Sequence, residues 1–302
     1  MDNVIEVNGL RKTYGSLVAV HDVGFGVRRG EIFGILGPNG AGKTTTVESI
    51  VGLRRPDSGT VRVLGLDPDR DGRQLRHRLG VQLQQATLPE RLKVWEALEL
   101  FASFYETPAD WRRLIQEWDL TEKRNASFAS LSGGQRQRLF IALALVGDPE
   151  VVILDELTSG LDPQARRATW DLIRAVRDGG TTVVLVTHFM DEAERLCDRL
   201  AIIDEGRIVA RGSPRDLIAG LEMEGRVRFS ANGSELGFLE AVAEVSQVTR
   251  EGGEAVVHGR GPILARVATA LAEQGIHPHD LRSEQPSLED VFLALTGKQL
   301  RD

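Results

Sequence analysis

The chain has 302 residues and a net charge of −7, with 41% apolar and 27% charged residues. The length is typical of about two domains, and the composition is that of a globular protein, which excludes a largely disordered or collagen-like chain. The acidic balance argues against nucleic acid as the main partner, and we expect none.

Cys197 is the single cysteine, which excludes a disulfide framework and any zinc site built on several thiolates. The N-terminus lacks the basic and apolar regions of a signal peptide. The longest apolar runs, 139–146 and 183–186, are much shorter than the ~20 residues that a membrane span needs. We therefore expect a chain that does not cross a bilayer by itself.

The chain opens with two extended stretches, in the second of which Val23, Phe25 and Val27 alternate with Gly24, Gly26 and Arg28. This period of two is typical of a half-buried strand. A second group of predicted elements follows in chain order: a buried strand at 31–36, a glycine-rich turn, a helix at 43–53 that ends before Pro56, and a strand at 60–64.

From about 92 to 147 the pattern is helical. Trp111, Leu114, Ile115 and Trp118 have the spacing of one helix face, and 136–146 is a further predicted helix. Strands then alternate with helices, which indicates a parallel sheet with crossover helices; the predicted elements are strands 151–155 and 182–187 and helices 163–177 and 191–198. The helical stretch is therefore an insertion between two halves of an α/β core.

After Gly220 the predicted elements change to the order βαββαβ, which is ferredoxin-like. They lie at 226–230, 235–242, 245–249, 255–258, 263–273 and 277–282. A last helix begins at Ser287, whose side chain can cap it together with Asp290, and ends at Gly297. Its apolar stripe, which we expect to pack on the domain's own sheet and alternatively to contact a partner, is Leu288, Val291, Phe292 and Leu295. We place the domains at 1–222 and 223–302.

The clearest chemical motif is a glycine-rich loop that fits G-x-x-x-x-G-K-[ST] between a predicted strand and a helix. Its residues are Gly37, Pro38, Asn39, Gly40, Ala41, Gly42, Lys43 and Thr44. Glycines let the backbone wrap phosphates, and several N–H groups and the helix N-terminus then face the anion. We expect Lys43 to reach the β- and γ-phosphates, Thr44 to ligate Mg²⁺ and the site to extend to Thr45.

Two carboxylates follow the buried strand 151–155 at its C-terminal end, which is the ligand edge of an open α/β sheet. Asp155 is suited to hold Mg²⁺ through water. Glu156 is suited to orient and polarise the attacking water. An Asp-Glu pair alone is weak evidence for such a site. Its occurrence in one chain with the Lys43 loop makes the evidence strong.

A third motif stands directly before a predicted helix: Ser132, Gly133, Gly134 and Gln135. A serine and two glycines at a helix N-terminus form a second anion-binding site. This stretch closely resembles the signature sequence of ABC-type ATPases. The resemblance covers about 1–220 and implies an α/β P-loop nucleotide-binding domain with a parallel-sheet core, an antiparallel β subdomain and a helical insertion at about 86–147.

The resemblance also assigns residues that the motifs alone do not. Tyr14 falls where the family stacks an aromatic ring on adenine. Gln84 falls where a glutamine reaches Mg²⁺ and the γ-phosphate, with Gln85 as the rival position. The segment 159–162, which ends in Asp162, resembles the loop that crosses the dimer interface, and His188 resembles the switch histidine that contacts the γ-phosphate.

One position departs from the family pattern: Leu157 stands where many members have proline after the Asp-Glu pair. This changes a loop residue and no ligand. The segments 285–292 and 295–297 are similar to the tail of ATPase subunits of daunorubicin-resistance-type exporters, which serve small permeases of the ABC-2 class. That ending occurs with several cargoes, so it indicates a branch and not a substrate.

The resemblance implies an ATPase at the cytoplasmic face of the cell membrane that uses ATP and Mg²⁺. It would power export of a drug, antibiotic or lipid-like substrate through a separate permease, with a docking groove around 84–95. Each chain has one Lys43 loop and one Ser132 loop, and in the family the two loops around one ATP come from different chains. We therefore expect a head-to-tail dimer, most simply a homodimer. A soluble ABC ATPase without a membrane partner and an importer ATPase remain the alternatives.

Overall fold

The computed structural model describes residues 2–84, 86–220, 224–231, 235–284 and 286–297. It divides into two compact units, Met1–Pro214 with 300–302 and Arg215–Gln299. This division lies N-terminal to the boundary at 222/223 expected from the sequence. Each unit is described by itself.

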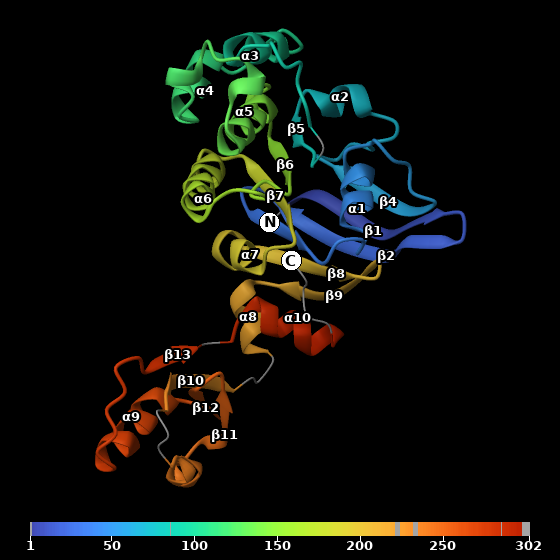
Figure 1. Cartoon of the computed structure of the whole chain (residues 1–302). Helices are drawn as coiled ribbons and strands as arrows, with labels where there is room; N and C mark the ends of the chain where they lie inside the picture. The colour runs from blue at the N-terminus through green and yellow to red at the C-terminus, as the bar shows by residue number, and fades with distance from the viewer. Residues whose placement is uncertain (1, 85, 221–223, 232–234, 285, 298–302) are drawn as a thin grey trace. The chain divides into compact units, whose positions relative to one another are not determined.

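The first unit is built on a six-stranded sheet with the strand order β5-β6-β7-β3-β8-β9 (Figure 1). The first five strands in this order are parallel, and β9 pairs antiparallel with β8. The strands are β5 (Leu79–Gln82), β6 (Val151–Asp155), β7 (Thr182–Thr187), β3 (Ile32–Leu36), β8 (Arg199–Asp204) and β9 (Arg207–Gly212). The predicted parallel core is present, with β5, β8 and β9 as strands that the sequence reading did not single out.

A second, three-stranded antiparallel sheet has the order β2-β1-β4. Its strands are β1 (Asn3–Tyr14), β2 (Leu17–Arg28) and β4 (Ser58–Val63). One buried core joins both sheets and α1 (Lys43–Ile50). In it the rings of Phe25 and Phe33, one from each sheet, stack with centroids 5.2 Å apart. This is the antiparallel β subdomain that the resemblance implied.

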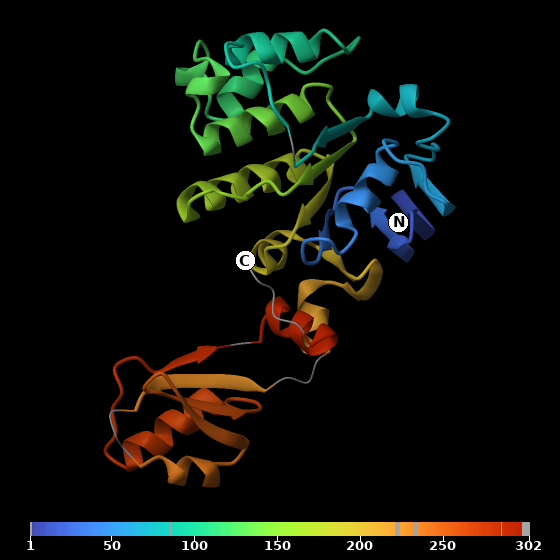
Figure 2. The same cartoon turned by 45° about the vertical axis from the view of Figure 1, so that its right-hand side comes forward.

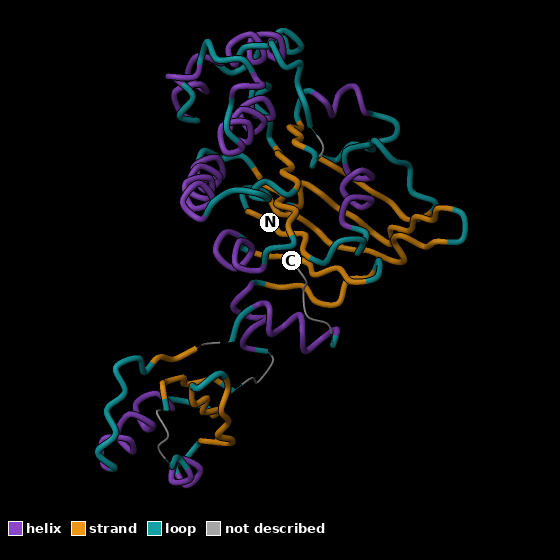
Figure 3. The backbone as a smooth tube through the Cα atoms, in the orientation of Figure 1, coloured by secondary structure: helices purple, strands orange, loops and turns teal. Residues whose placement is uncertain are grey.

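Helices flank the six-stranded sheet, with α6 and α7 on one side and α1 on the other (Figures 1 and 3). The insertion contributes α3, α4 and α5, which group at one end of the unit (Figure 2). The helices are α2 (Gly72–Arg76), α3 (Val94–Ala102), α4 (Trp111–Glu117), α5 (Gly133–Leu145), α6 (Pro163–Asp178) and α7 (Met190–Leu196), with 3₁₀ turns at Thr121–Lys123 and Phe128–Ser130. The apolar face predicted at Trp111 is buried, as are Leu114, Ile115 and Trp118. Among the described residues, no helix combines the length and the apolar character of a membrane span.

The second unit contains α8 (Pro214–Ala219) and a four-stranded antiparallel sheet with the order β11-β12-β10-β13. Helix α9 (Ile263–Glu273) packs on this sheet through Ile263, Val267 and Leu271. The strands are β10 (Gly225–Ser230), β11 (Val245–Glu251), β12 (Glu254–Gly259) and β13 (Arg282–Glu284).

Two predicted elements of this unit are wrong. The segment 235–242 forms only a 3₁₀ turn, Gly237–Ala241, because it is short and contains a glycine, which disfavours an α-helix. The strand predicted at 277–282 is only three residues long and begins at Arg282. Pro278 lacks the N–H that a ladder needs, so pairing with β10 begins after it.

Helix α10 (Leu288–Thr296) is capped as predicted: Ser287 Oγ accepts from Asp290 N, and Asp290 Oδ2 accepts from Ser287 N at 3.0 Å. Gly297, at φ 67, ends the helix. The predicted packing of its stripe on the sheet is wrong. Over the described ranges, the sheet's core draws on β10, β11, β12, α9 and the turn 237–241, but not on α10. Figures 1 and 2 show α10 beside α8 instead.

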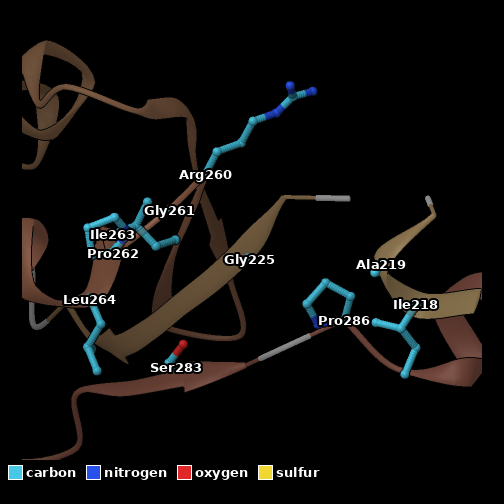
Figure 4. Close-up of a pocket in the computed structure, with 10 residues that line it drawn as sticks. All are labelled: Ile218, Ala219, Gly225, Arg260, Gly261, Pro262, Ile263, Leu264, Ser283 and Pro286. Atoms are coloured by element: carbon cyan, nitrogen blue, oxygen red, sulfur yellow. The ribbon is translucent and has the colours of Figure 1, made fainter. Parts of the chain in front are cut away.

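A cavity of about 670 Å³ lies in the second unit. Figure 4 shows the first turn of α9, with Pro262 and Leu264, on one side and Ile218 and Pro286 on the other. Of its ten lining residues, Arg260 is the charged one. Such a lining favours an apolar contact over a polyphosphate ligand.

Candidate active site

The carboxyl ends of three neighbouring parallel strands meet at one edge of the six-stranded sheet. Leu36 at the end of β3 pairs with Thr187 of β7, and Asp155 at the end of β6 pairs with Val186. The glycine-rich loop, the Asp155–Glu156 pair and His188 leave the sheet at this edge. Ligands of open α/β sheets bind at such an edge.

The glycine-rich loop has a backbone that requires glycine. Gly37 has φ 152, and a Cβ there would lie 2.0 Å from Ile203 O; Gly42 has φ 101, and its Cβ would lie 2.5 Å from Ala19 O. A Cβ on Gly40 would instead meet nothing within 4 Å, so this side of the loop is open. Helix α1 follows with no side-chain cap. Its first N–H groups therefore remain available to an anion.

Lys43 lies across its own loop. Its Nζ donates to Gly37 O at 2.8 Å and to Pro38 O at 3.0 Å, and the side chain is only 5% exposed. Burial lowers the pKa of Lys43, and the charges of Glu156 and Asp155 oppose that change. The ammonium therefore stands where the loop encloses it, next to the two carboxylates.

Glu156 is the centre of the site. Its Oε2 accepts from Gln84 Nε2 at 2.6 Å, while its Oε1 lies 3.2 Å from His188 Nδ1 and 4.0 Å from Lys43 Nζ. The residue has φ 51, a left-handed conformation that costs a non-glycine residue about 1 kcal/mol. Its N–H donates to Val186 O at 2.8 Å, which holds that conformation. The structure thus brings together the four residues predicted to act in catalysis: Lys43, Gln84, Glu156 and His188.

Asp155 is 1% exposed and lies beside this group. Burial, with the charge of Glu156, raises the pKa of its carboxyl to about 6, and Lys43 and the Gln84 backbone N–H oppose the rise. Its Oδ2 is buried and has no hydrogen-bond partner in the described part of the chain.

These donors fit Mg²⁺. The ion takes oxygen ligands and is usually held by one or two carboxylates together with substrate phosphates and water. An orphaned carboxylate oxygen of Asp155 meets that requirement, and the Thr44 hydroxyl directly follows Lys43 on the exposed side of the loop. Across the described residues, no group of three or more His, Cys, Asp or Glu side chains could hold a metal by itself. The site therefore suits a metal that arrives with its substrate.

The second predicted anion site lies at the start of α5. Ser132 Oγ accepts from Gln135 N at 3.3 Å, and Gln135 Oε1 accepts from Ser132 N at 3.0 Å, which is a reciprocal cap. A Cβ on Gly134 would lie 3.8 Å from Leu161, so the loop 159–162 runs beside it. Within the described ranges, no hydrogen bond or ion pair joins this cap to the Lys43–Glu156 group.

Two further predicted residues lie outside that group. Tyr14, at the end of β1, is 38% exposed, with Lys12 Nζ and the Arg54 guanidinium 5.9 and 5.4 Å from its ring centroid. Asp162 caps α6, with Oδ1 accepting from Gln164 N and Ala165 N. The rival glutamine, Gln85, lies outside the described residues.

Glu192 is a buried polar residue that the sequence reading missed. It is 0% exposed, on α7, and hydrogen-bonds to Trp170. The segment reads as a charged surface helix, but Phe189, Glu192 and Leu196 have the spacing of one helix face. That periodicity is the signal that could have found it.

The ABC transporter family matches residues 20–159. The Nod factor export ATP-binding protein I of Ralstonia nicotianae is 40% identical over 312 residues, which cover 99% of this chain and 95% of the relative. The chain belongs to the ABC transporter ATP-binding proteins. This ABC transporter ATPase is also 38% identical to daunorubicin resistance ATP-binding protein DrrA3 of Streptomyces coeruleorubidus, over 99% of this chain and 98% of that protein.

Solved structures resemble about 70% of the ABC transporter ATPase. An ATP-binding subunit of an ABC transporter, 31% identical, aligns with a TM-score of 0.66 over 72% of this chain and 93% of its own. The bacterial cassette MJ0796, solved as a dimer, is 28% identical, with a TM-score of 0.62 over 69% of this chain and 98% of its own.

Proposed function

We propose that this ATPase binds and hydrolyses ATP with Mg²⁺ at the Lys43–Glu156 group and thereby powers export through a separate permease. The observation that carries the hydrolytic part is the Glu156 carboxylate, held by Gln84 on one oxygen and facing His188 and Lys43 with the other. A carboxylate fixed in this way can orient and polarise a water molecule.

Each residue of the group has a separable role. Lys43 exchanges its two loop carbonyls for the β- and γ-phosphates, because a phosphate is a stronger acceptor for an ammonium than a carbonyl. Glu156 positions the water, and Gln84 and His188 hold Glu156 and face the γ-phosphate. Thr44, Asp155 and Gln84 would hold Mg²⁺, which neutralises charge on the phosphates. The helix N-terminus after Gly42 supplies further N–H donors.

We infer that the working unit is a head-to-tail dimer with two composite ATP sites. One chain offers one Lys43 loop and one Ser132 cap, and no described contact joins them. The dimeric solved cassette is similar over 69% of this chain. In the dimer, the Ser132 cap and the loop 159–162 of one chain would complete the Lys43 site of the other, with Tyr14 against the adenine. A homodimer is the simplest form.

The exported substrate is a drug, an antibiotic or a lipid-like molecule. Similarity over 99% of the chain to a Nod factor export ATP-binding protein and to a daunorubicin resistance ATP-binding protein supports export as the direction. The ATPase would then work at the cytoplasmic face of the membrane, and the domain expected from the sequence at 223–302 would be a ferredoxin-like accessory domain without catalytic residues. Reconstitution with the permease in vesicles tests the direction of transport. Substrate should cross the membrane away from the side that contains ATP, and movement towards that side would contradict export.

A groove of the first unit is the proposed docking place of the permease. It has a volume of about 600 Å³, and its lining includes Leu83, Arg73 and Arg76. No described residue of 84–95, where the sequence analysis expected the docking groove, lines it, so the proposed docking place differs from that expectation and only adjoins it at Leu83. Leu53 and Phe104 in its wall are 63% and 61% exposed. Two large apolar side chains that are exposed in one groove form an apolar patch, and such patches favour an interaction surface.

Copurification with the permease tests the groove. Leu53→Asp and Phe104→Asp should abolish copurification while ATP binding persists. Leu100→Asp is the matched control, since Leu100 is 48% exposed on α3 and does not line the groove. Equal loss of the permease in all three variants would contradict the assignment.

A further inference from the structure

The carboxyl group of Glu192 lies where three segments of the first unit meet. The residue is fully buried on α7. Its neighbours are Trp170 of α6, Thr187 at the end of β7 and Thr158 in the loop that follows β6, and each of these is also buried. Thr158 stands two residues after Glu156, and Thr187 directly precedes His188. The Glu192 side chain therefore lies near residues that neighbour both Glu156 and His188 in the chain.

One of these contacts is a formed hydrogen bond. Trp170 Nε1 donates to Glu192 Oε1 at 3.0 Å. The buried Thr187 hydroxyl lies close enough to lower the pKa of the carboxyl group, and its Oγ1 accepts from Phe189 N at 3.0 Å. Thr187, at the end of β7, therefore links the turn that carries His188 to the surroundings of Glu192.

The contact between Glu192 and Thr158 is incomplete. Glu192 Oε2 and Thr158 Oγ1 are both buried, and neither has a hydrogen-bond partner within the described residues. The two groups nevertheless lie close enough for the Thr158 hydroxyl to lower the pKa of the Glu192 carboxyl, which burial raises. Buried polar atoms without partners are rare and costly, and a small shift of the loop would pair these two.

Burying a carboxyl group at this position also costs free energy. Burial penalises its charged form, and an apolar side chain of similar size would carry no such penalty. The hydrogen bond from Trp170 fixes Oε1, and within the described residues Oε2 is left buried without a partner, close to the buried Thr158 hydroxyl.

We propose that Glu192 is a positioning residue that couples the loop 156–162 to His188, by pairing with Thr158 when the loop moves and by holding Thr187 throughout. The inference rests on the proposed roles of Glu156 and His188. A displacement of the loop at the dimer interface would then reach His188 through one side chain. Because an error of ~1 Å in such a group costs about 10²-fold in rate, the coupling is measurable.

Turnover by the full-length protein tests the proposal. Glu192→Ala should lower kcat about tenfold or more and leave the KM for ATP within about twofold, because it removes positioning and no ATP contact. Glu192→Gln should retain most of kcat, since its amide oxygen still accepts from Trp170 and its NH₂ can donate to Thr158 Oγ1. Glu194→Ala, on the exposed side of the same helix, is the matched control and should behave as the wild type.

Thr158→Val keeps the side-chain shape and removes the hydroxyl. Since that hydroxyl has no partner, the variant should unfold at the wild-type temperature or higher. Its kcat should still fall several-fold, because the loop can no longer pair with Glu192. A merely structural role predicts the reverse, a changed melting temperature with unchanged kcat.

Wild-type kcat in Thr158→Val, or equal losses in Glu192→Ala and Glu192→Gln, would overturn the proposal. His188→Ala is measured in parallel. If it turns over normally, the proposed role of His188 fails. If it is inactive while Glu192→Ala is normal, only the coupling through Glu192 fails.

Discussion

Gln84 donates a hydrogen bond from its Nε2 to Oε2 of Glu156 over 2.6 Å, although the two residues are 72 positions apart in the chain. The helical insertion separates them in sequence, and the pairing of β5 with β6 brings them together in space. A displacement of the insertion that moves the end of β5 therefore acts on the residue proposed to position the water. This bond relates the proposed permease groove, which includes Leu83, to hydrolysis.

Hydrolysis should depend on the charge of Glu156. Glu156→Gln keeps the size and the hydrogen bond from Gln84 but removes the charge that polarises water. We expect kcat to fall about 10²- to 10⁴-fold, with ATP still bound and the dimer held closed. Turnover measured by phosphate release tests this. Glu117→Gln, at an exposed glutamate of α4, is the control. Turnover of Glu156→Gln at the wild-type rate would show that Glu156 does not act in hydrolysis.

Nucleotide binding should depend on Lys43. Lys43→Ala removes the ammonium that is to meet the phosphates. A hydrogen bond to a charged group contributes about 1.5–3 kcal/mol, so the Kd for ATP should rise about 10- to 100-fold. Equilibrium binding of a fluorescent ATP analogue measures the change. Lys93→Ala, with a half-exposed side chain at the start of α3, serves as control. Equal affinity of wild type and Lys43→Ala would contradict the assignment.

The site motifs could be predicted from the sequence because they are local. The glycine-rich loop and the Asp155–Glu156 pair each lie within a few residues of a buried strand, so their chemistry and their place at the sheet edge follow from one short segment. The pairing of Gln84 with Glu156 depends on strand order, and only the family resemblance indicated it. No motif indicated Glu192, because a charged residue in a short helix reads as solvated.

The fold, like the site, could be predicted from the sequence only in part. The parallel core was predictable from the alternation of strands and helices, but β13 was not, since its three residues are a strand only through pairing with β10. The stripe on α10 was correctly recognised as buried at Leu288, Val291 and Phe292 but not at Leu295, which is 45% exposed. Helical spacing identifies a buried face and carries no information on what covers it.

Stability should depend on pH through Asp155. The pKa of its carboxyl is raised from 3.8 to about 6, so the folded state favours the protonated form. The cost of ionising it is absent below the unfolded pKa near 4, grows between pH 4 and 6, and is complete above that range, where it amounts to about 3 kcal/mol. Stability from this group therefore falls as pH rises from 4 to 6.

Asp155→Asn removes that titration and keeps the side-chain size. We expect the variant to be more stable than the wild type at pH 7 and to approach it at pH 4, in urea denaturation without nucleotide or divalent cations. Asp171→Asn, at a side chain that is 76% exposed, is the control. A stability difference between Asp155→Asn and wild type that stays constant from pH 4 to 7 would show that Asp155 titrates normally.

Ser132 should act on the ATP bound by the other chain. Ser132→Arg places bulk and charge at the start of α5, and Lys43→Ala removes the phosphate contact, so each variant alone should be inactive. In a mixed dimer, one of the two composite sites has both loops intact, and mixing the two proteins should restore turnover. The regained activity should rise with the fraction of mixed dimers and be greatest at equal amounts.

A mixture that stays inactive at every ratio has two explanations, and a binding measurement separates them. Both variants are made again with Glu156→Gln, which blocks hydrolysis, and retained ATP is counted after gel filtration. If mixed dimers retain ATP at one site and the hydrolysing mixture is inactive, the composite site exists and both sites must be intact for turnover. If mixed dimers retain no ATP while dimers with only Glu156→Gln do, the two loops do not meet across the interface, and the head-to-tail arrangement is wrong.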